Sequence, residues 1–557
     1  MHGRRSANEA IKEASRGLRG GIAEGLRDHI TGAIADEDTQ LTKFHGIYQQ
    51  DDRDLRAERT KKKMEKAFSF MARVRIPGGV LTPQQWIGLH DIAAERGNGT
   101  LRLTTRQTVQ FHGVIKSNLQ PALRGIHAAL LDTIAACGDV NRNVIASVVP
   151  QRPALHADIT ALARSLSEHL LPRTRAWHEI WVDGEKLIGD DAEEEPILGH
   201  TYLPRKFKIA IAVPPQNDTD VFAHEIGLIA IVEAGAIVGY DVAVGGGMGM
   251  THGEPDTYPR TGDVIGFCPR DRVLDVCEKI VTIQRDWGDR ADRKHARLKY
   301  TIERVGLDRF VAELHTRLDY ELSPPRPYAF ERTGDPVGWV QGEDGTAHHF
   351  LFVENGRVGG AMLDGLRAIA AVHEGRFILT PNQNLVIADV AAGARTEIDA
   401  LLHRLGLAQA SALRRNAMAC VALPTCGLAL AESERFLPGL ITLLEEEAAR
   451  HGLAEDEIIV RMTGCPNGCA RPYLAEIGLV GTGPGRYNLY LGAAFDGTRL
   501  SKLYQRDLGE AGIIAALAPL FAAYARERTP RERFGDFVIR TGRIRATTAG
   551  RDFHAEL

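Results

Sequence analysis

The sequence predicts an α+β protein built from two related halves. Strand-like apolar runs at residues 70–76, 101–111 and 208–213 are interleaved with helical patterns such as residues 157–171. Two pairs of short segments also match in the same order along the chain: 103–111 (LTTRQTVQF) with 379–387 (LTPNQNLVI), and 142–148 (RNVIASV) with 415–421 (RNAMACV). Two ordered matches favour an internal duplication over chance similarity of short strands.

The length and composition are those of a large globular protein. A chain of 557 residues is too long for one hydrophobic core and predicts about three or four compact units. Hydrophobic residues (44%) and charged residues (25%) are near the averages of globular proteins, which excludes a fibrous or disordered chain. A net charge of -4 argues against a general nucleic-acid-binding surface.

Neither a membrane span nor a secretory signal is expected. The longest strongly apolar stretch, residues 513–525, contains Pro519 and is shorter than the roughly 18 residues that cross a bilayer, so it predicts a packed helix. Charges throughout residues 1–13 argue against a secretory signal, and we expect a cytoplasmic protein. Residues 1–60 show little periodicity and predict an extended arm that could cover the body or a partner.

Four of the seven cysteines form two pairs. Cys420 and Cys426 have C-x5-C spacing, and Cys465 and Cys469 have C-x3-C spacing. Four thiolates are the usual ligands of a [4Fe-4S] cluster. A structural zinc site and unligated buried cysteines remain alternatives, because spacing alone excludes neither. The three unpaired cysteines are expected to be buried and inert: Cys137, Cys268 and Cys277.

Arginine and lysine side chains gather in or beside strand-like runs. They lie in five segments: Arg73 and Arg75; Arg102 and Arg106; Arg142; Arg205, Lys206 and Lys208; Arg414 and Arg415. One such side chain usually faces solvent, but several together predict a cavity that binds anions. Period-two alternation would place five residues on one face of a strand: Arg102, Arg106, Thr108, Gln110 and His112.

Two further segments are less specific. Residues 245–252 (GGGMGMTH) could let a large flat ligand approach the backbone closely, although glycine runs are usually turns. Residues 290–299 are rich in Arg, Lys and His and predict a solvated helix face.

These motifs together resemble the sirohaem sulfite and nitrite reductase family, and within it the haemoprotein (beta) subunits of NADPH-dependent assimilatory sulfite reductases. The resemblance runs from about residue 44 to residue 552, and beyond the cysteine pairs it includes residues 48–54, 103–112, 141–143, 203–208 and 245–253. It implies duplicated ferredoxin-like and sirohaem-binding halves in a pseudo-two-fold arrangement, with three domains around central cofactors. The implied division is an N-terminal arm and partner-docking candidate (1–60), paired ferredoxin-like repeats (61–130 with 325–400), a first sirohaem- and substrate-binding domain (131–324) and a second sirohaem domain with the cluster (401–557).

The resemblance also implies the site residues. The [4Fe-4S] cluster would be held by Cys420, Cys426, Cys465 and Cys469, with Cys469 also bridging to the sirohaem iron. The substrate pocket would consist of Arg73, Arg142, Lys206 and Lys208. Sirohaem would lie against Arg102, Arg106, Gln110, His112, Asn143, Gly246 and Gly247.

The implied function is the six-electron reduction of sulfite to sulfide, in sulfate assimilation and cysteine biosynthesis. A sirohaem nitrite reductase, a ferredoxin-dependent sulfite reductase, and a non-catalytic zinc- or RNA-binding module remain alternatives. The two lysines in residues 203–208 (LPRKFK) resemble the sulfite-reducing members. No G-x-G-x-x-G motif follows a strand, so NADPH electrons should come from a flavoprotein partner that carries FAD and FMN.

Overall fold

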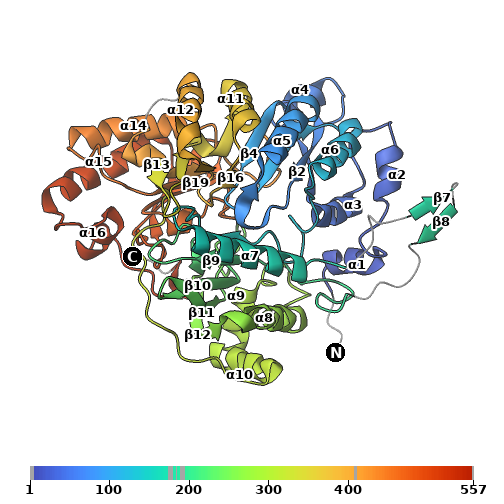
Figure 1. Cartoon of the computed structure of the whole chain (residues 1–557), viewed down its shortest axis with the longest axis horizontal. Helices are drawn as coiled ribbons and strands as arrows, with labels where there is room; N and C mark the ends of the chain where they lie inside the picture. The colour runs from blue at the N-terminus through green and yellow to red at the C-terminus, as the bar shows by residue number, and fades with distance from the viewer. Residues whose placement is uncertain (1–4, 174–179, 183–184, 189–194, 407–409, 555–557) are drawn as a thin grey trace.

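The computed structural model describes residues 5–173, 180–182, 185–188, 195–406 and 410–554. Within these residues the fold consists of four five-stranded sheets, which form two related pairs, and a small hairpin of β7 (Ile180–Val182) and β8 (Glu185–Ile188). Figure 1 shows helices α8 to α10 at one end of the molecule and α14 to α16 at another, with α5, α6, α11 and α12 above them.

The first pair of sheets consists of the ferredoxin-like repeats, with strand orders β1-β2-β5-β4-β15 and β13-β14-β17-β16-β3. Each sheet takes its last strand from the other repeat, because β15 pairs with β4 and β3 pairs with β16. The strands of the first sheet are β1 (Ile47–Asp51), β2 (Phe68–Arg73), β4 (Thr100–Leu103), β5 (Val109–Val114) and β15 (Arg357–Gly359). Those of the second are β3 (Val80–Leu81), β13 (Gly338–Gln341), β14 (Ala347–Leu351), β16 (Arg376–Leu379) and β17 (Leu385–Val390).

The helices of these repeats are α5 (Pro83–Arg96), α6 (Lys116–Ala128), α11 (Gly360–Val372) and α12 (Arg395–Arg404). Helix α5 begins at a capping box, in which Thr82 and Gln85 satisfy each other's backbone N–H groups, and Pro83 occupies the first turn. The two repeats share one hydrophobic core, in which Trp86 stacks on Phe377 with ring centroids 5.1 Å apart. This shared core joins the repeats into one unit.

The second pair of sheets has the orders β12-β11-β10-β9-β6 and β18-β19-β20-β21-β22. Starting from β6 in the first sheet and from β18 in the second, two parallel pairings are followed by two antiparallel pairings. This shared pattern is expected for duplicated units. The first sheet contains β6 (Ile145–Ala146), β9 (Ile209–Ala212), β10 (Ile226–Glu233), β11 (Ala236–Val244) and β12 (Asp263–Pro269). The second contains β18 (Ala417–Ala419), β19 (Val460–Thr463), β20 (Ile477–Gly483), β21 (Arg486–Leu491) and β22 (Lys502–Leu508).

Each of these sheets packs with its own helices around a separate hydrophobic core. The helices of the first unit are α7 (Pro153–His169), α8 (Val273–Trp287), α9 (Leu298–Val305) and α10 (Leu307–Leu318). Those of the second are α13 (Ala412–Arg415), α14 (Leu437–Arg450), α15 (Glu510–Glu527) and α16 (Phe534–Arg540). No helix among the described residues has both the length and the apolar character that a membrane crossing requires.

The N-terminal segment differs from the extended arm that the sequence predicted. It contains α1 (Ala7–Ala14), α2 (Ile22–Arg27), α3 (Asp36–Leu41), the 3-10 turn η1 (Thr42–His45), β1 and α4 (Arg56–Lys61). Leu18, Leu41 and Phe44 are buried in the core of the first large unit, and β1 pairs with β2. The expectation of an extended arm is therefore wrong. The segment packs through its apolar side chains on the first large unit, and through β1 it joins a sheet of the ferredoxin-like repeats.

Other local expectations are mostly confirmed. The expected helices at 157–171 and 513–525 are α7 and α15. The run at 101–111 is not one strand but a hairpin, in which β4 and β5 place Arg102 opposite Gln110. The turn between them closes by a Thr104 to Thr108 backbone hydrogen bond of 3.0 Å, so Arg106 lies in a turn and not on the strand face.

Candidate active site

One cavity of about 470 Å³ lies where the four sheets and the N-terminal segment meet. Its lining contains four cysteines and a single carboxylate, that of Asp139. Twelve lining side chains are cationic: Lys12, Lys43, Arg73, Arg102, Arg106, Arg142, Arg205, Lys206, Lys208, Arg293, Arg297 and Arg471. Several of these side chains have a carboxylate partner outside the lining: Arg102 pairs with Glu434, Arg297 with Glu225 and Arg471 with Asp220. The remaining excess of cationic side chains favours anions inside the cavity.

The four paired cysteines all line this cavity, at the ends of β18 and β19. Backbone and side-chain N–H groups point at the sulfurs: Gly464 N lies 3.4 Å from Cys420 Sγ, and Asn467 Nδ2 lies 3.6 Å from Cys465 Sγ. Burial, and then the neighbouring Cys469, raise the pKa of Cys465 to about 12. A cationic cluster would reverse this effect by binding the thiolates.

The part of the chain that the structure describes has no group of three or more His, Cys, Asp or Glu side chains arranged to hold a single metal ion. The site fits an iron-sulfur cluster, which is larger than a single ion, because four thiols line one cavity and N–H donors lie beside their sulfurs. Such donors are typical of iron-sulfur sites, where they tune the reduction potential.

The four predicted substrate residues also line the cavity. Arg73 Nη1 donates to Cys137 Sγ at 3.0 Å, and Arg73 Nε donates to the Gln110 amide oxygen at 3.1 Å when that amide is oriented to accept. Arg142 forms a hydrogen bond with Tyr48 and donates to the Gly138 carbonyl at 3.2 Å. Cys137 is buried, as expected, but it contacts the predicted substrate residue Arg73.

Lys206 and Lys208 are half-buried side chains that face the cavity. Burial, and then the neighbouring Arg205 and Arg142, lower the pKa of Lys206 to about 7. Burial and then Arg297 lower the pKa of Lys208 well below its usual value. Lys206 can therefore exchange a proton near neutral pH, and the charged form of Lys208 is likewise disfavoured, whereas an arginine stays charged.

Four of the predicted sirohaem residues line the cavity: Arg102, Arg106, Gln110 and His112. Burial, followed by three nearby arginines, lowers the pKa of His112 well below its usual value, so its imidazole is neutral. Among the described residues, the buried Nε atoms of Arg102 and Arg106 and the Nδ1 atom of His112 have no hydrogen-bond partner. Unpaired groups in a cationic cavity fit a ligand that carries many carboxylates, as sirohaem does.

The other three predicted sirohaem residues lie outside the lining. Asn143 is buried and donates to the carbonyls of Ile76 and Arg106, each at 2.9 Å. A Cβ atom at Gly246 would lie 2.1 Å from the Phe222 carbonyl oxygen, and one at Gly247 would lie 2.5 Å from the Arg297 guanidinium. The structure thus gives these residues roles in packing around the cavity, and their contact with sirohaem stays a prediction.

Sequence reasoning missed several cavity cations. Residues 290–299 are not a solvated helix face: Arg293 binds Asp139 at 2.8 and 3.0 Å, and Arg297 is buried beside Glu225. Lys12 and Lys43 reach the cavity from the N-terminal segment. No local pattern distinguishes these residues from surface cations, because their contacts are with segments far away in the chain.

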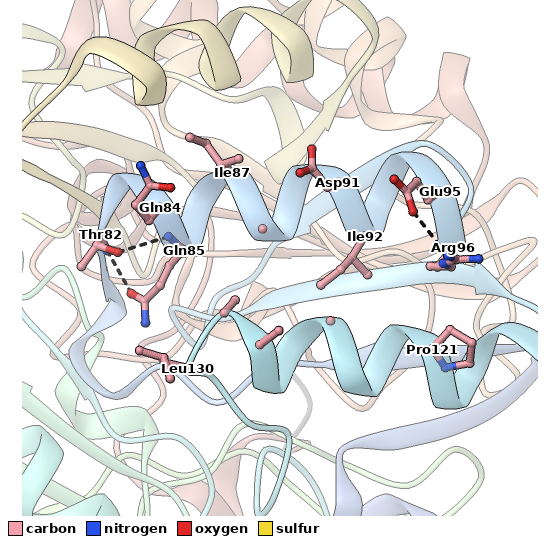
Figure 2. Close-up of a pocket in the computed structure, with 14 residues that line it drawn as sticks. Thr82, Gln84, Gln85, Ile87, Asp91, Ile92, Glu95, Arg96, Pro121 and Leu130 are labelled. Atoms are coloured by element: carbon pink, nitrogen blue, oxygen red, sulfur yellow. Dashed lines mark hydrogen bonds and ion pairs between the residues drawn. The ribbon is translucent and has the colours of Figure 1, made fainter.

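A second pocket of about 580 Å³ lies between helices α5 and α6 (Figure 2). Figure 2 shows Ile87 and Ile92 on one helix, Pro121 on the other, and Leu130 at one end. Asp91, Glu95 and Arg96 line it as well. It contains none of the predicted site residues.

Comparison with known proteins identifies the family of this chain. Models of the "Nitrite/Sulfite reductase ferredoxin-like half domain" match residues 62–129 and 340–405, and a "Nitrite and sulphite reductase 4Fe-4S domain" model matches residues 162–322. A "Sulfite reductase [NADPH] hemoprotein beta-component" from Methylobacterium sp. (strain 4-46) is 61% identical, over 99% of this chain and 92% of its own length.

The chain belongs to the nitrite and sulphite reductase family. A second relative with the same name, from Staphylococcus haemolyticus, is 54% identical over 99% of this chain and 97% of its own length. The solved structure of the Mycobacterium tuberculosis NirA protein superimposes with a TM-score of 0.77 at 26% identity, covering 96% of each chain. The duplicated α+β fold predicted from the sequence is thus confirmed.

The family's 4Fe-4S domain model matches the first large unit, whereas the four paired cysteines lie in the second. In the first unit Ser147 takes the place that Cys420 has in the second, as the repeated segments align. Ser147 Oγ donates to the buried Asp218 at 2.5 Å, so this position forms a buried hydrogen bond in the first unit. All four paired cysteines, the predicted cluster ligands, therefore lie in the second unit.

Proposed function

We propose that this chain reduces sulfite to sulfide with six electrons, at a sirohaem coupled to a [4Fe-4S] cluster. The observation that carries the proposal is a single cavity that brings four cysteine thiols together with a wall of arginines and lysines. A zinc- or RNA-binding module would not explain why these cations gather inside a cavity and not on the surface. When bound, the two cofactors supply electrons one at a time and an iron atom that binds the sulfur of sulfite.

The protein's own residues would then have distinct tasks. Cys420, Cys426, Cys465 and Cys469 would hold the cluster, and Cys469, the exposed member of the set, would also bind the sirohaem iron. Arg73 and Arg142 fix the charge of the substrate oxygens because they remain cationic throughout. Lys206 and Lys208 donate protons to oxygens that leave as water, since their lowered pKa values favour proton release.

The remaining cavity cations would bind the carboxylates of sirohaem. Arg102, Arg106, Gln110 and His112 lie on the same hairpin and line one wall. Asn143, Gly246 and Gly247 support that wall through the packing described above. These assignments together make one site for a flat polyanion beside a cluster.

The electron supply should lie on another polypeptide. The relatives are named as a hemoprotein beta-component, which describes one component of a larger enzyme. We infer a flavoprotein partner with FAD and FMN, with ferredoxin as the alternative donor, in the cytoplasm. We also propose that residues 1–60 dock the partner. The proposed domains of the rest of the chain are the paired ferredoxin-like repeats (61–130 with 325–400), the first sirohaem domain (131–324) and the second sirohaem domain (401–557).

The test is spectroscopy and metal analysis of the purified chain, followed by steady-state kinetics with a chemical reductant. We expect a coloured protein with haem and iron-sulfur absorption, about five iron atoms per chain, and a higher kcat/KM for sulfite than for nitrite. A colourless, zinc-containing protein would reject the redox function. A preference for nitrite would instead assign the chain to the nitrite reductases.

A further inference from the structure

Part of the cavity lining comes from the N-terminal segment. Three half-buried side chains from it line the cavity together: Asn8 on α1, Gln40 on α3 and Lys43 on η1. The Gln40 amide oxygen accepts from Asn8 Nδ2 at 3.1 Å and from Lys43 Nζ at 2.6 Å. One amide thus links the first helix of the chain to a lysine at the cavity.

This wall is anchored to the body of the protein. Buried Lys12 on α1 donates to the Leu203 carbonyl at 2.8 Å and pairs with Glu9. Glu9 also pairs with Arg290 at 2.6 Å, and Ser6 N donates to the Arg290 carbonyl at 3.0 Å. These buried contacts make α1 an integral part of the site, because breaking them would leave charges unpaired in the interior.

Lys43 lies near Arg142, with the Tyr48 side chain between them in the chain of contacts. Its ammonium lies 5.8 Å from the centroid of the Tyr48 ring, and the Tyr48 hydroxyl forms a hydrogen bond with Arg142. The hydrogen bond of Lys43 goes to a neutral amide, whereas the carboxylate of the lining, Asp139, is bound by Arg293. The charge of Lys43 is therefore poorly compensated by the protein and is available to an entering anion.

We propose that Lys43 is a further substrate-positioning residue, which attracts the anionic substrate into the cavity and passes it to Arg142. The inference deepens the proposed function and depends on it. A single uncompensated charge at the entrance of a cationic cleft acts mainly on the association rate and little on the chemical step. Burial, and then Arg293, lower the pKa of Lys43 to about 8, which shows that it lies in the same cationic field.

The experiment measures ligand association with the reduced holoenzyme by stopped-flow absorbance. It compares sulfite, an anion, with carbon monoxide, an uncharged haem ligand. Lys43→Ala and Lys43→Gln should lower the association rate constant for sulfite on the order of tenfold and weaken its dependence on salt, with carbon monoxide unchanged. Lys43→Arg should restore most of the sulfite rate, because it keeps the charge.

Lys62→Ala is the matched control, since Lys62 is an exposed lysine paired with Glu58 and lies outside the cavity lining. Hydrogen exchange of residues 7–14 shows whether the wall is intact in each variant. An unchanged sulfite rate in both neutral variants would overturn the proposal, and so would full restoration by Gln or an equal slowing of carbon monoxide. If the wild-type enzyme binds nitrite but not sulfite, the sulfite reductase function fails, and the same comparison with nitrite still tests Lys43.

Discussion

At the scale of single residues, two kinds of cationic side chain line the cavity: arginines, whose charge is permanent, and lysines, whose charge depends on pH. Arg73 is fixed by Cys137 and Gln110, and Arg142 by Tyr48 and Gly138. The two lysines behave differently, because burial among other cations disfavours their charged forms. An anion that enters the cavity changes this balance at the lysines and leaves the arginines as they were.

This difference predicts that anion binding depends on pH because Lys206 gains or loses a proton. The pKa of Lys206 is lowered to about 7, and a bound anion favours its charged form and raises that pKa, so binding takes up a proton. Anion affinity should therefore fall as the pH rises above about 7, by at most about tenfold per pH unit. Titration with nitrite, whose own charge is constant in this range, measures the effect.

Lys206→Arg should flatten this pH profile, because a guanidinium stays charged at every pH tested. The exposed Lys62→Arg variant serves as the control and should keep the wild-type profile. A profile that is equally steep in Lys206→Arg would assign the proton uptake to another group.

At the scale of elements, the ferredoxin-like repeats hold the loop that carries Cys420. Arg102 on β4 pairs with Glu434 and donates to the Ala419 carbonyl at 2.7 Å. Arg357 on β15 donates to the other Glu434 oxygen at 2.6 Å, and Gln383 donates to the Ala419 carbonyl at 3.0 Å. Strands from both repeats thus meet at one carboxylate beside the cluster ligands.

Removing that carboxylate should loosen the cluster loop. Glu434→Gln leaves the buried Arg102 without its counter-charge, and breaking such a pair costs about 3 kcal/mol of unfolding free energy. We expect a lower denaturation midpoint and a reduced iron content per chain. Glu432→Gln is the matched control, since Glu432 pairs with Arg435 at the surface. Equal midpoints and iron contents for the two variants would contradict a role for Glu434 in holding the loop.

At the scale of the whole molecule, the cavity exists only where the duplicated units meet. The repeats exchange the edge strands β3 and β15 and share one core, so neither half can complete its sheet alone. The four paired cysteines come from the second large unit, and Lys206 and Lys208 come from the first. The site is therefore a property of the complete chain.

The absence of a dinucleotide-binding motif from the sequence predicts that the chain alone cannot use NADPH. The purified holoprotein should accept electrons from dithionite or reduced viologen and should not oxidise NADPH in the presence of sulfite. Addition of the proposed flavoprotein partner should permit NADPH oxidation coupled to sulfide formation. NADPH consumption by the chain on its own would show that this expectation is wrong.

The sequence by itself determined the parts that depend on local patterns. Duplication was visible in two short segments because homologous strands keep their residues in order, and the cysteine spacing identified a four-thiol set because ligands on tight loops are close in sequence. The helices α7 and α15 followed from apolar periodicity. The family resemblance then gave the fold and the cofactors, which the comparisons confirm.

Only the tertiary structure decided which cations face the cavity and which are paired elsewhere. Arg414 was grouped with the site cations but binds Glu354 and Glu445, whereas Arg297 and Lys43 were missed and line the cavity. The physical reason is that burial and counter-charge come from segments hundreds of residues apart, and no local pattern records them. The sequence around an arginine is the same whether its side chain faces the cavity or pairs with a carboxylate from a distant segment.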